Sequence, residues 1–269
     1  MCDELHRVLF VHKTFKVHLL AKYDKIAVHQ INKVGDYMTI AKKPTHSIEI
    51  KELLKLANRI TETKVGQYLF QEGMNADKLY LVLSGKVKIS KITAEGHELD
   101  MRICGSDDIC GELTLFTESP KYLLNAMVIE EGQIAVINKN DLEQTLFQNS
   151  SLAYEFMKWM SDHFRKTQTK FRDLVLIGKK GALYSTLIRM TNSYGVAVKD
   201  GILIDLPLTN QDLGNFCGTS RESVNRYLNE LKRQGIISMK SGKITVHQVQ
   251  FLKDAIHCEN CSAVFCSIE

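Results

Sequence analysis

The chain has 269 residues, of which 44% are hydrophobic, and a formal net charge of +4. This length suits about two domains of ~100–200 residues, and such a composition allows buried cores. No apolar run approaches the ~20 residues of a membrane-spanning helix and no secretory signal begins the sequence, so we expect a cytoplasmic protein without a membrane partner. The seven cysteines are then expected to stay reduced and to favour metal or redox chemistry over disulfides.

Residues 1–46 carry five of the nine histidines without a sustained helix or strand period. We expect a poorly ordered extension or a misassigned translation start; a metal-binding or docking arm is the alternative. No function is assigned to this segment.

Residues 47–148 alternate short β-like runs with glycines, a rhythm typical of an antiparallel sandwich or barrel. Residues 79–83 form an apolar run that predicts a buried strand. After the turn at Ser84 and Gly85, residues 86–90 alternate polar with apolar side chains, which predicts a hairpin with one exposed face.

Residues 149–178 change to a helical period. Apolar or small residues recur alternately four and three positions apart, which predicts a helix that pairs with a second copy; the alternative is a helix packed on its own domain. The positions are Ala153, Met157, Met160, Phe164, Thr167, Phe171 and Leu174. A glycine-containing break at residues 178–181 precedes a second helical stretch over 182–192.

Residues 179–256 contain a predicted winged helix-turn-helix. Thr209 is expected to cap a first helix with Asp212 at its third position, and that helix ends at Gly218. Thr219 is expected to cap the second helix, with Glu222 completing another capping box. Residues 235–240 and 243–246 then form the wing around the turn at 241–242.

The second helix carries side chains that can read DNA bases. Arginine can donate two hydrogen bonds to guanine and a carboxylate can accept one from cytosine, although these residues could also merely solvate a surface helix. The candidate residues are Arg221, Glu222, Ser223, Asn225 and Arg226, and candidate phosphate contacts are Lys232, Arg233, Lys240 and Lys243. No phosphate-binding loop or nucleophile–base arrangement is recognisable, so we expect no enzyme.

Residues 257–269 contain three cysteines in the spacing Cys258-x2-Cys261-x4-Cys266. Short spacings let several thiolates approach one centre, as iron–sulfur clusters and zinc require. A structural zinc site and unliganded thiols are the open alternatives.

From about residue 50 to 256 the chain resembles the CRP/FNR superfamily of bacterial transcription regulators. The resemblance implies an α+β fold with an amino-terminal β-roll, like the cyclic-nucleotide-binding jelly roll, a long dimerisation helix and a carboxy-terminal winged helix-turn-helix. It implies a homodimer that binds double-stranded DNA, with Arg221, Glu222 and Arg226 contacting bases of a palindrome of TGTGA-like half-sites, and RNA polymerase as a partner. The FNR of enteric bacteria has serine where this chain has Asn225, so its half-site is not assumed.

Members that sense cyclic nucleotides use a Gly-Glu pair followed by an Arg-Ser pair. Gly111 and Glu112 are present, but residues 118–126 contain no arginine, and Lys121 is a poor substitute for its phosphate-binding fork. The sequence therefore argues against cyclic nucleotide. The amino-terminal cysteine cluster of enteric FNR is also missing, because only Cys2 lies there.

The cysteine spacing resembles the FNR regulators of Bacillus species, in which three such cysteines and an aspartate hold a [4Fe–4S] cluster. Asp173 matches that aspartate; it could instead be a surface residue paired with Arg172 or Lys170. A buried cysteine, Cys104, Cys110 or Cys217, could also take its place. The resemblance implies an oxygen-responsive regulator, mainly an activator of anaerobic genes, that binds DNA with the cluster intact. The alternative is a CRP-like regulator with a structural zinc or unliganded tail and a different signal.

Overall fold

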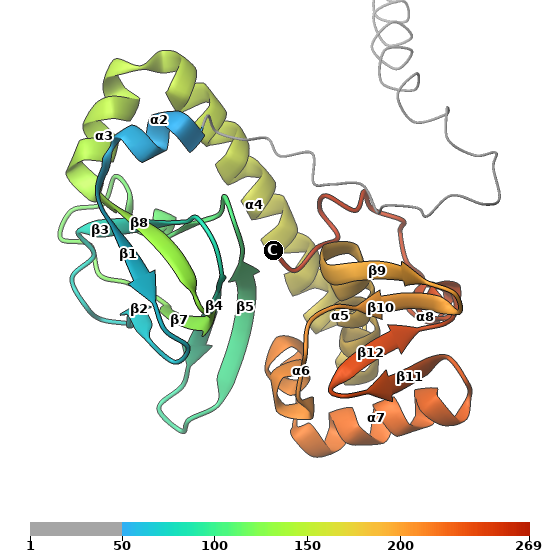
Figure 1. Cartoon of the computed structure of the whole chain (residues 1–269). Coiled ribbons are helices and arrows are strands. Elements are labelled where there is room, and N and C mark those ends of the chain that lie inside the picture. The colour runs from blue at the N-terminus through green and yellow to red at the C-terminus, as the bar shows by residue number, and fades with distance from the viewer. Residues whose placement is uncertain (1–49) are drawn as a thin grey trace, which may run out of the picture. The chain divides into compact units, whose positions relative to one another are not determined.

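The computed structural model describes residues 50–269, in which strands and helices are both abundant (Figure 1). They give the predicted α+β class, with a β-roll, a long helix and a winged helix-turn-helix in chain order. The expected extension over residues 1–46 lies outside the described residues. None of the helices from residue 50 onward is long and apolar enough to cross a membrane.

The β-roll consists of two four-stranded antiparallel sheets, with strand orders β1-β8-β3-β6 and β2-β7-β4-β5. Helix α2 (Ile50–Lys55) precedes them, and a single 3-10 turn, η1 (Glu112–Thr114), interrupts them. The strands are β1 (Ala57–Thr63), β2 (Tyr68–Phe70), β3 (Lys78–Val82), β4 (Lys86–Ile92), β5 (Glu98–Cys104), β6 (Ile109–Cys110), β7 (Asn125–Glu130) and β8 (Gly132–Asn138).

From Leu79 onward strand β3 is apolar, because both of its faces are covered. Leu79 and Leu81 pack in a buried cluster with residues of the helices that follow the β-roll. Tyr80 and Val82 face the opposite way, into the cluster between the two sheets. A strand buried on both faces is expected to be a continuous apolar run rather than an alternating one.

The predicted hairpin between residues 79–83 and 86–90 is wrong. Strand β3 pairs with β8 and β6, whereas β4 pairs with β5 and β7, so the turn at Gly85 carries the chain from one sheet to the other. The expected exposed face of β4 is also absent, because Lys88 and Ser90 are buried. The Lys88 ammonium lies 3.0 Å from Glu98 and 3.3 Å from Asp100, which compensates its burial.

Helix α3 (Lys139–Gln148) leads into α4 (Ser150–Leu176), which begins where the Asn149 side chain accepts a hydrogen bond from the Leu152 amide. One face of α4 packs on the β-roll through Leu152, Phe156 and Trp159. Apolar side chains on the rest of α4 remain exposed, and we call them the α4 stripe: Tyr154, Met157, Phe164, Phe171, Val175 and Leu176. Three of them, Met157, Phe164 and Phe171, belong to the predicted pairing seam.

The winged helix-turn-helix is built around α5 (Gly178–Tyr194), which is buried from Gly181 to Thr191. The other elements are β9 (Gly195–Val198), β10 (Gly201–Ile204), α6 (Asn210–Cys217), α7 (Arg221–Arg233), β11 (Ile237–Lys240), β12 (Lys243–Val246) and α8 (Val249–Ala255). The wing strands β11 and β12 pair as predicted, and the two-residue turn between them has positive φ at Ser241 and Gly242, as a type I′ hairpin requires.

Candidate functional sites: a DNA-reading helix and a cysteine pocket

The two helices of the predicted DNA-reading motif meet at a tight turn. Thr209 and Asp212 form the expected capping box at the start of α6, and Gly218 ends that helix with φ 58°. Gly214 lets the turn lie close to α6, because a Cβ there would be only 2.7 Å from the Thr219 carbonyl oxygen. The absence of a side chain at Gly214 therefore allows the turn before α7 to lie close to α6.

The expected cap of α7 is wrong by one residue. Ser220, rather than Thr219, is the cap: its hydroxyl accepts a hydrogen bond from the Ser223 amide at 3.3 Å. The Thr219 hydroxyl is buried without a hydrogen-bond partner. Glu222 therefore occupies the second helical position and not the third, so it does not form the capping box that the sequence predicted.

All five candidate base-reading residues lie in the first half of α7. Arg221, Glu222, Asn225 and Arg226 are exposed, and Ser223 is half-buried. Their backbone is held by the apolar face of α7, on which Val224, Leu228 and Leu231 are buried. The exposed face thus carries two arginines, a carboxylate and an amide on one rigid helix.

The candidate phosphate contacts differ in their surroundings. Lys232, Arg233 and Lys240 are exposed, whereas Lys243 is half-buried and its ammonium lies 2.5 Å from Asp205. An ion pair with Asp205 reduces the charge that Lys243 offers to a phosphate, so the first three are the stronger candidates.

The cysteine tail and the carboxy-terminal end of α4 line one pocket of about 120 Å³. All four candidate metal ligands border it: Cys258, Cys261, Cys266 and Asp173. Three half-buried thiols and one carboxylate are donor types that both zinc sites and iron–sulfur sites can use. Among residues 50–269, no three His, Cys, Asp or Glu side chains are arranged to hold a single metal ion.

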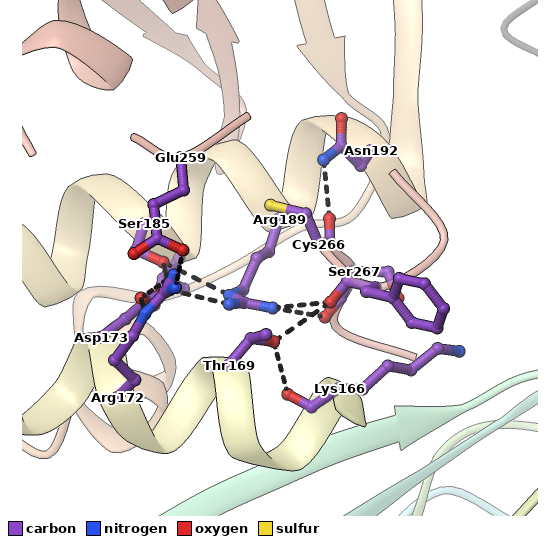
Figure 2. Close-up of polar contacts among 12 residues, drawn as sticks. Lys166, Thr169, Arg172, Asp173, Ser185, Arg189, Asn192, Glu259, Cys266 and Ser267 are labelled. Carbon is purple, nitrogen blue, oxygen red and sulfur yellow. Dashed lines mark hydrogen bonds and ion pairs between the residues drawn. The ribbon is translucent and has the colours of Figure 1, made fainter. Parts of the chain in front are cut away.

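Asp173 is not a surface residue, because only 8% of it is exposed. Its Oδ2 accepts hydrogen bonds from the Ser185 hydroxyl at 2.6 Å and from the Arg189 guanidinium at 2.7 Å. Its Oδ1 accepts from Arg172 at 2.9 Å (Figure 2). Burial would raise the pKa of Asp173, but the bonds from Arg189, Ser185 and Arg172 outweigh it and lower the pKa below its usual value.

Of the two cations suggested as partners for Asp173, only Arg172 contacts it. The Lys170 ammonium instead donates to the backbone oxygens of Asp100 at 2.6 Å and Met101 at 2.9 Å. These bonds join α4 to strand β5. Arg172 also pairs with Glu259, a second carboxylate that borders the cysteine pocket.

The surroundings of Cys266 shift the pKa of its thiol. Burial raises the pKa of the Cys266 thiol, Arg189 opposes this, and the nearby Cys258 and Cys261 raise it further. The other described cysteines are buried in β5, β6 and α6, and none of them lines this pocket; they are Cys104, Cys110 and Cys217.

Sequence reasoning missed Arg189 and Ser185, which lie four residues apart on α5 and reach Asp173 together. Arg189 is only 2% exposed. The signal was a lone arginine inside the otherwise mostly apolar stretch ALYSTLIRM, because a buried arginine needs an anionic partner.

The β-roll has a larger pocket of about 220 Å³, bordered by β-roll residues, α4 and residues 267–269. Glu112, half of the expected Gly-Glu pair, accepts a hydrogen bond from Arg102 at 2.9 Å. Arg102 also donates to the Ile109 carbonyl at 2.8 Å. Both groups are thus engaged within the chain, and Lys121 is exposed and does not line this pocket.

Two family models match the chain, a cyclic nucleotide-binding domain over residues 61–149 and a Crp-like helix-turn-helix domain over residues 181–255. The anaerobic regulatory protein of Bacillus subtilis is 54% identical over 224 residues, covering 83% of this chain and 94% of that protein. The lactate racemization regulatory protein of Lactiplantibacillus plantarum is 30% identical over 198 residues, covering 70% and 87%.

Solved structures give the same fold. The c-di-GMP responsive regulator CLP of Xanthomonas campestris aligns with a TM-score of 0.66 at 24% identity, over 74% of this chain and 97% of its own. A CooA mutant of Carboxydothermus hydrogenoformans also gives 0.66, at 20% identity over 80% and 97%. With a β-roll, an exposed α7 in a winged helix-turn-helix and a relative above half identity, the chain belongs to the CRP/FNR family of transcription regulators.

Proposed function

We propose that this regulator responds to oxygen and binds palindromic TGTGA-like DNA as a homodimer when a [4Fe–4S] cluster is intact, acting mainly as an activator of anaerobic genes in the cytoplasm. The observation that carries the proposal is the cysteine pocket, which brings Asp173 of α4 next to the cysteines of the tail. The name of the B. subtilis relative, an anaerobic regulatory protein, supports the same signal.

The cluster ligands in this proposal are Cys258, Cys261, Cys266 and Asp173. Three thiolates and one carboxylate match the preference of iron–sulfur clusters for sulfur ligands, with one position left for an oxygen donor. When bound, such a cluster supplies a centre that oxygen destroys. Arg189 and Ser185 orient the Asp173 carboxylate, and Arg172 neutralises charge beside the cysteines.

The coupling to DNA follows from where the ligands lie. Asp173 belongs to α4, whereas the cysteines follow α8 of the winged helix-turn-helix, so ligand bonds would join α4 to the DNA-binding domain. A switch from 1:99 to 99:1 needs about 5.5 kcal/mol of preference for the binding state. Metal–ligand bonds in structural sites contribute on the order of 10 kcal/mol, which is sufficient.

Dimerisation is proposed through the α4 stripe. A row of exposed apolar side chains on a helix of 27 residues is too costly to leave in water, and a second copy can cover it. In this arrangement residues 47–148 form the β-roll domain, 149–178 the dimerisation helix, 179–256 the DNA-binding domain and 257–269 the ligand tail. Arg221, Glu222, Ser223, Asn225 and Arg226 read the bases, and RNA polymerase is the protein partner at the promoter.

The proposal includes no catalysis and no cyclic nucleotide. Glu112 accepts a hydrogen bond from Arg102, and residues 118–126 contain no arginine that could bind a phosphate. Because the Glu112 carboxylate already accepts a hydrogen bond from Arg102, it is less available to bind the ribose of a nucleotide.

The test is anaerobic purification followed by absorbance spectra, iron and sulfide analysis, and DNA binding before and after exposure to air. We expect iron and sulfide near the ratio of a [4Fe–4S] cluster and weaker DNA binding after air. Zinc without iron would instead support the alternative CRP-like regulator with a structural zinc. DNA binding that air does not change would rule out the oxygen switch.

A further inference from the structure

Residues 265–269, which follow the last cysteine ligand candidate closely, are bound by three separate elements. On the α5 side, the Arg189 guanidinium donates to the carbonyl oxygens of Phe265 at 3.1 Å and Ser267 at 3.5 Å. The Asn192 amide donates to the Cys266 carbonyl oxygen at 2.6 Å (Figure 2). Three consecutive carbonyl groups of the segment are therefore held by α5.

On the β-roll side, the segment contacts strand β5. The Ile103 amide donates to the Ile268 carbonyl oxygen at 3.2 Å, while the Ile268 amide donates to the Ser193 hydroxyl at 2.9 Å. Strand β5 is at the edge of its sheet, so this N–H has no neighbouring strand to bond. An unpaired N–H at a buried edge is costly, and Ile268 satisfies it.

The side chains of the segment are anchored as well. Ile268 is only 2% exposed and packs in the same cluster as Ile103 and the core of the winged helix-turn-helix. The Phe265 ring lies 5.4 Å from the Arg165 guanidinium of α4. The Thr169 hydroxyl of α4 donates to the Phe265 carbonyl oxygen at 3.4 Å.

We infer that residues 265–269 act as a clasp that fastens strand β5 of the β-roll to α5 of the DNA-binding domain and, through the same bonds, positions Cys266. Ile268 is the residue that closes the clasp, because it joins Ser193 of α5 to Ile103 of β5 through its own amide and carbonyl. Cys266 lies two residues before Ile268, so a ligand bond at its sulfur would restrain a segment that already contacts both domains.

The clasp itself depends only on hydrogen bonds and burial, whereas its role in oxygen sensing rests on the proposed function. The Cys266 carbonyl oxygen is bonded to Asn192 of α5, and the β5 contact at Ile268 follows two residues later, so a change at the Cys266 sulfur would act on both. In this way the state of the cysteine pocket reaches the β-roll as well as the DNA-binding domain.

The direct test is amide hydrogen exchange at Ile103 in the full chain, measured by NMR or by mass spectrometry with residue-level fragmentation. Ile268→Asp places a charge in a buried apolar site and should expose the Ile103 amide, with exchange at least ~10-fold faster than in the unsubstituted protein. Ser193→Ala removes one anchor without altering the core and should give a smaller acceleration at the same amide.

The matched control is Phe251→Asp on α8, which makes a similar change at a side chain that is 36% exposed. It should leave exchange at Ile103 unchanged. If Ile268→Asp does not fold, Ser193→Ala alone decides. Unchanged protection at Ile103 in every folded clasp variant would overturn the inference.

The same measurement separates this inference from the proposed function. Faster exchange at Ile103 in the clasp variants, in a protein whose unsubstituted form contains no iron, would support the clasp and contradict the cluster. Normal exchange at Ile103 in variants of a protein that does hold iron would overturn the clasp and leave the cluster standing.

Discussion

Asp173 and Arg189 form a buried ion pair between α4 and α5, with 2.7 Å between Oδ2 and Nη2 (Figure 2). Because Arg189 also holds the backbone of residues 265 and 267, one guanidinium connects the proposed cluster ligand to the segment that carries Cys266. The pair is therefore both a stabilising element and a support for the cysteine pocket.

Arg189→Met should destabilise the protein by about 3–5 kcal/mol, because it leaves the Asp173 carboxylate buried beside fewer donors. Arg172→Met, which removes the more exposed partner of the same carboxylate, should cost about 0–1 kcal/mol. Urea denaturation of the two variants makes the comparison. Equal losses would mean that Arg189 has no special role in stabilising the carboxylate.

Asp173→Asn should lower the iron and sulfide content of anaerobically reconstituted protein, because an amide is a weaker ligand than a carboxylate. Glu259→Gln is the matched control, since Glu259 borders the same pocket. It should retain a full cluster. A full, stable cluster in Asp173→Asn would remove this residue from the ligand set, and loss in Glu259→Gln alone would transfer the assignment to Glu259.

Arg226→Ala should weaken binding to a TGTGA-like palindrome by about 1–3 kcal/mol and relax the preference for one base pair in each half-site. Lys232→Ala removes an expected phosphate contact and should weaken binding to all sequences alike, lowering the salt slope by about 1. Fluorescence anisotropy at several salt concentrations distinguishes them. A uniform loss for Arg226→Ala would make it a backbone contact.

Asp100→Asn should change how stability depends on pH. Asp100 is 0% exposed; burial raises its pKa to about 7, with Lys88 opposing and Glu98 adding to the rise. The unfolded carboxyl titrates near ~3.9, so between these values the folded state holds a proton that the unfolded state releases. Stability from this group is complete below the unfolded pKa and falls as pH rises towards 7.

The Asp100→Asn variant lacks that loss. The free energy of unfolding of the variant minus that of the unsubstituted protein should therefore become more positive by on the order of 2 kcal/mol as the pH rises from about 5 to about 8. Asp205→Asn is the control. A hydrogen bond from Lys243 lowers the pKa of this exposed carboxyl, so Asp205 stays ionised throughout this pH range and its substitution should not change the pH dependence. Parallel pH profiles for Asp100→Asn and the unsubstituted protein would contradict the expectation.

Gly214→Ala should destabilise the helix-turn-helix by about 1–3 kcal/mol, because the new Cβ would meet the Thr219 carbonyl oxygen at 2.7 Å. Gly105→Ala, whose Cβ would have its nearest contact at 3.8 Å, is the control and should change stability little. Thermal unfolding measures both. DNA binding should weaken only in the first variant, as α7 is displaced.

Local signals in the sequence predicted much of the DNA-reading motif. The capping box of Thr209 and Asp212 is set by residues three positions apart, and the wing turn by two residues that accept positive φ. The second cap was misplaced because Thr219 and Ser220 are neighbouring hydroxyl residues, and only the three-dimensional path of the turn selects between them.

The pairing of strands far apart in the chain could not be predicted from the sequence. Strands β3 and β4 follow each other along the chain, but their partners β8 and β7 come much later in the chain and lie in different sheets. Arg189 was missed because its contact with Asp173 depends on how α5 packs on α4, and its contact with Ser267 joins positions 78 residues apart. Neither pairing leaves a periodic pattern.

The cap at Ser220 has a consequence for the free energy of the free protein. It makes Arg221 the first residue of α7, at the positive end of the helix dipole, where a cation costs about 0.3–1 kcal/mol. Arg221→Ala should therefore stabilise the unbound domain slightly while it weakens DNA binding. The Arg221 guanidinium at the amino-terminal end of α7 therefore lowers the stability of the helix in the free protein. Contact of this guanidinium with an electronegative base edge would offset its repulsion from the positive end of the helix dipole.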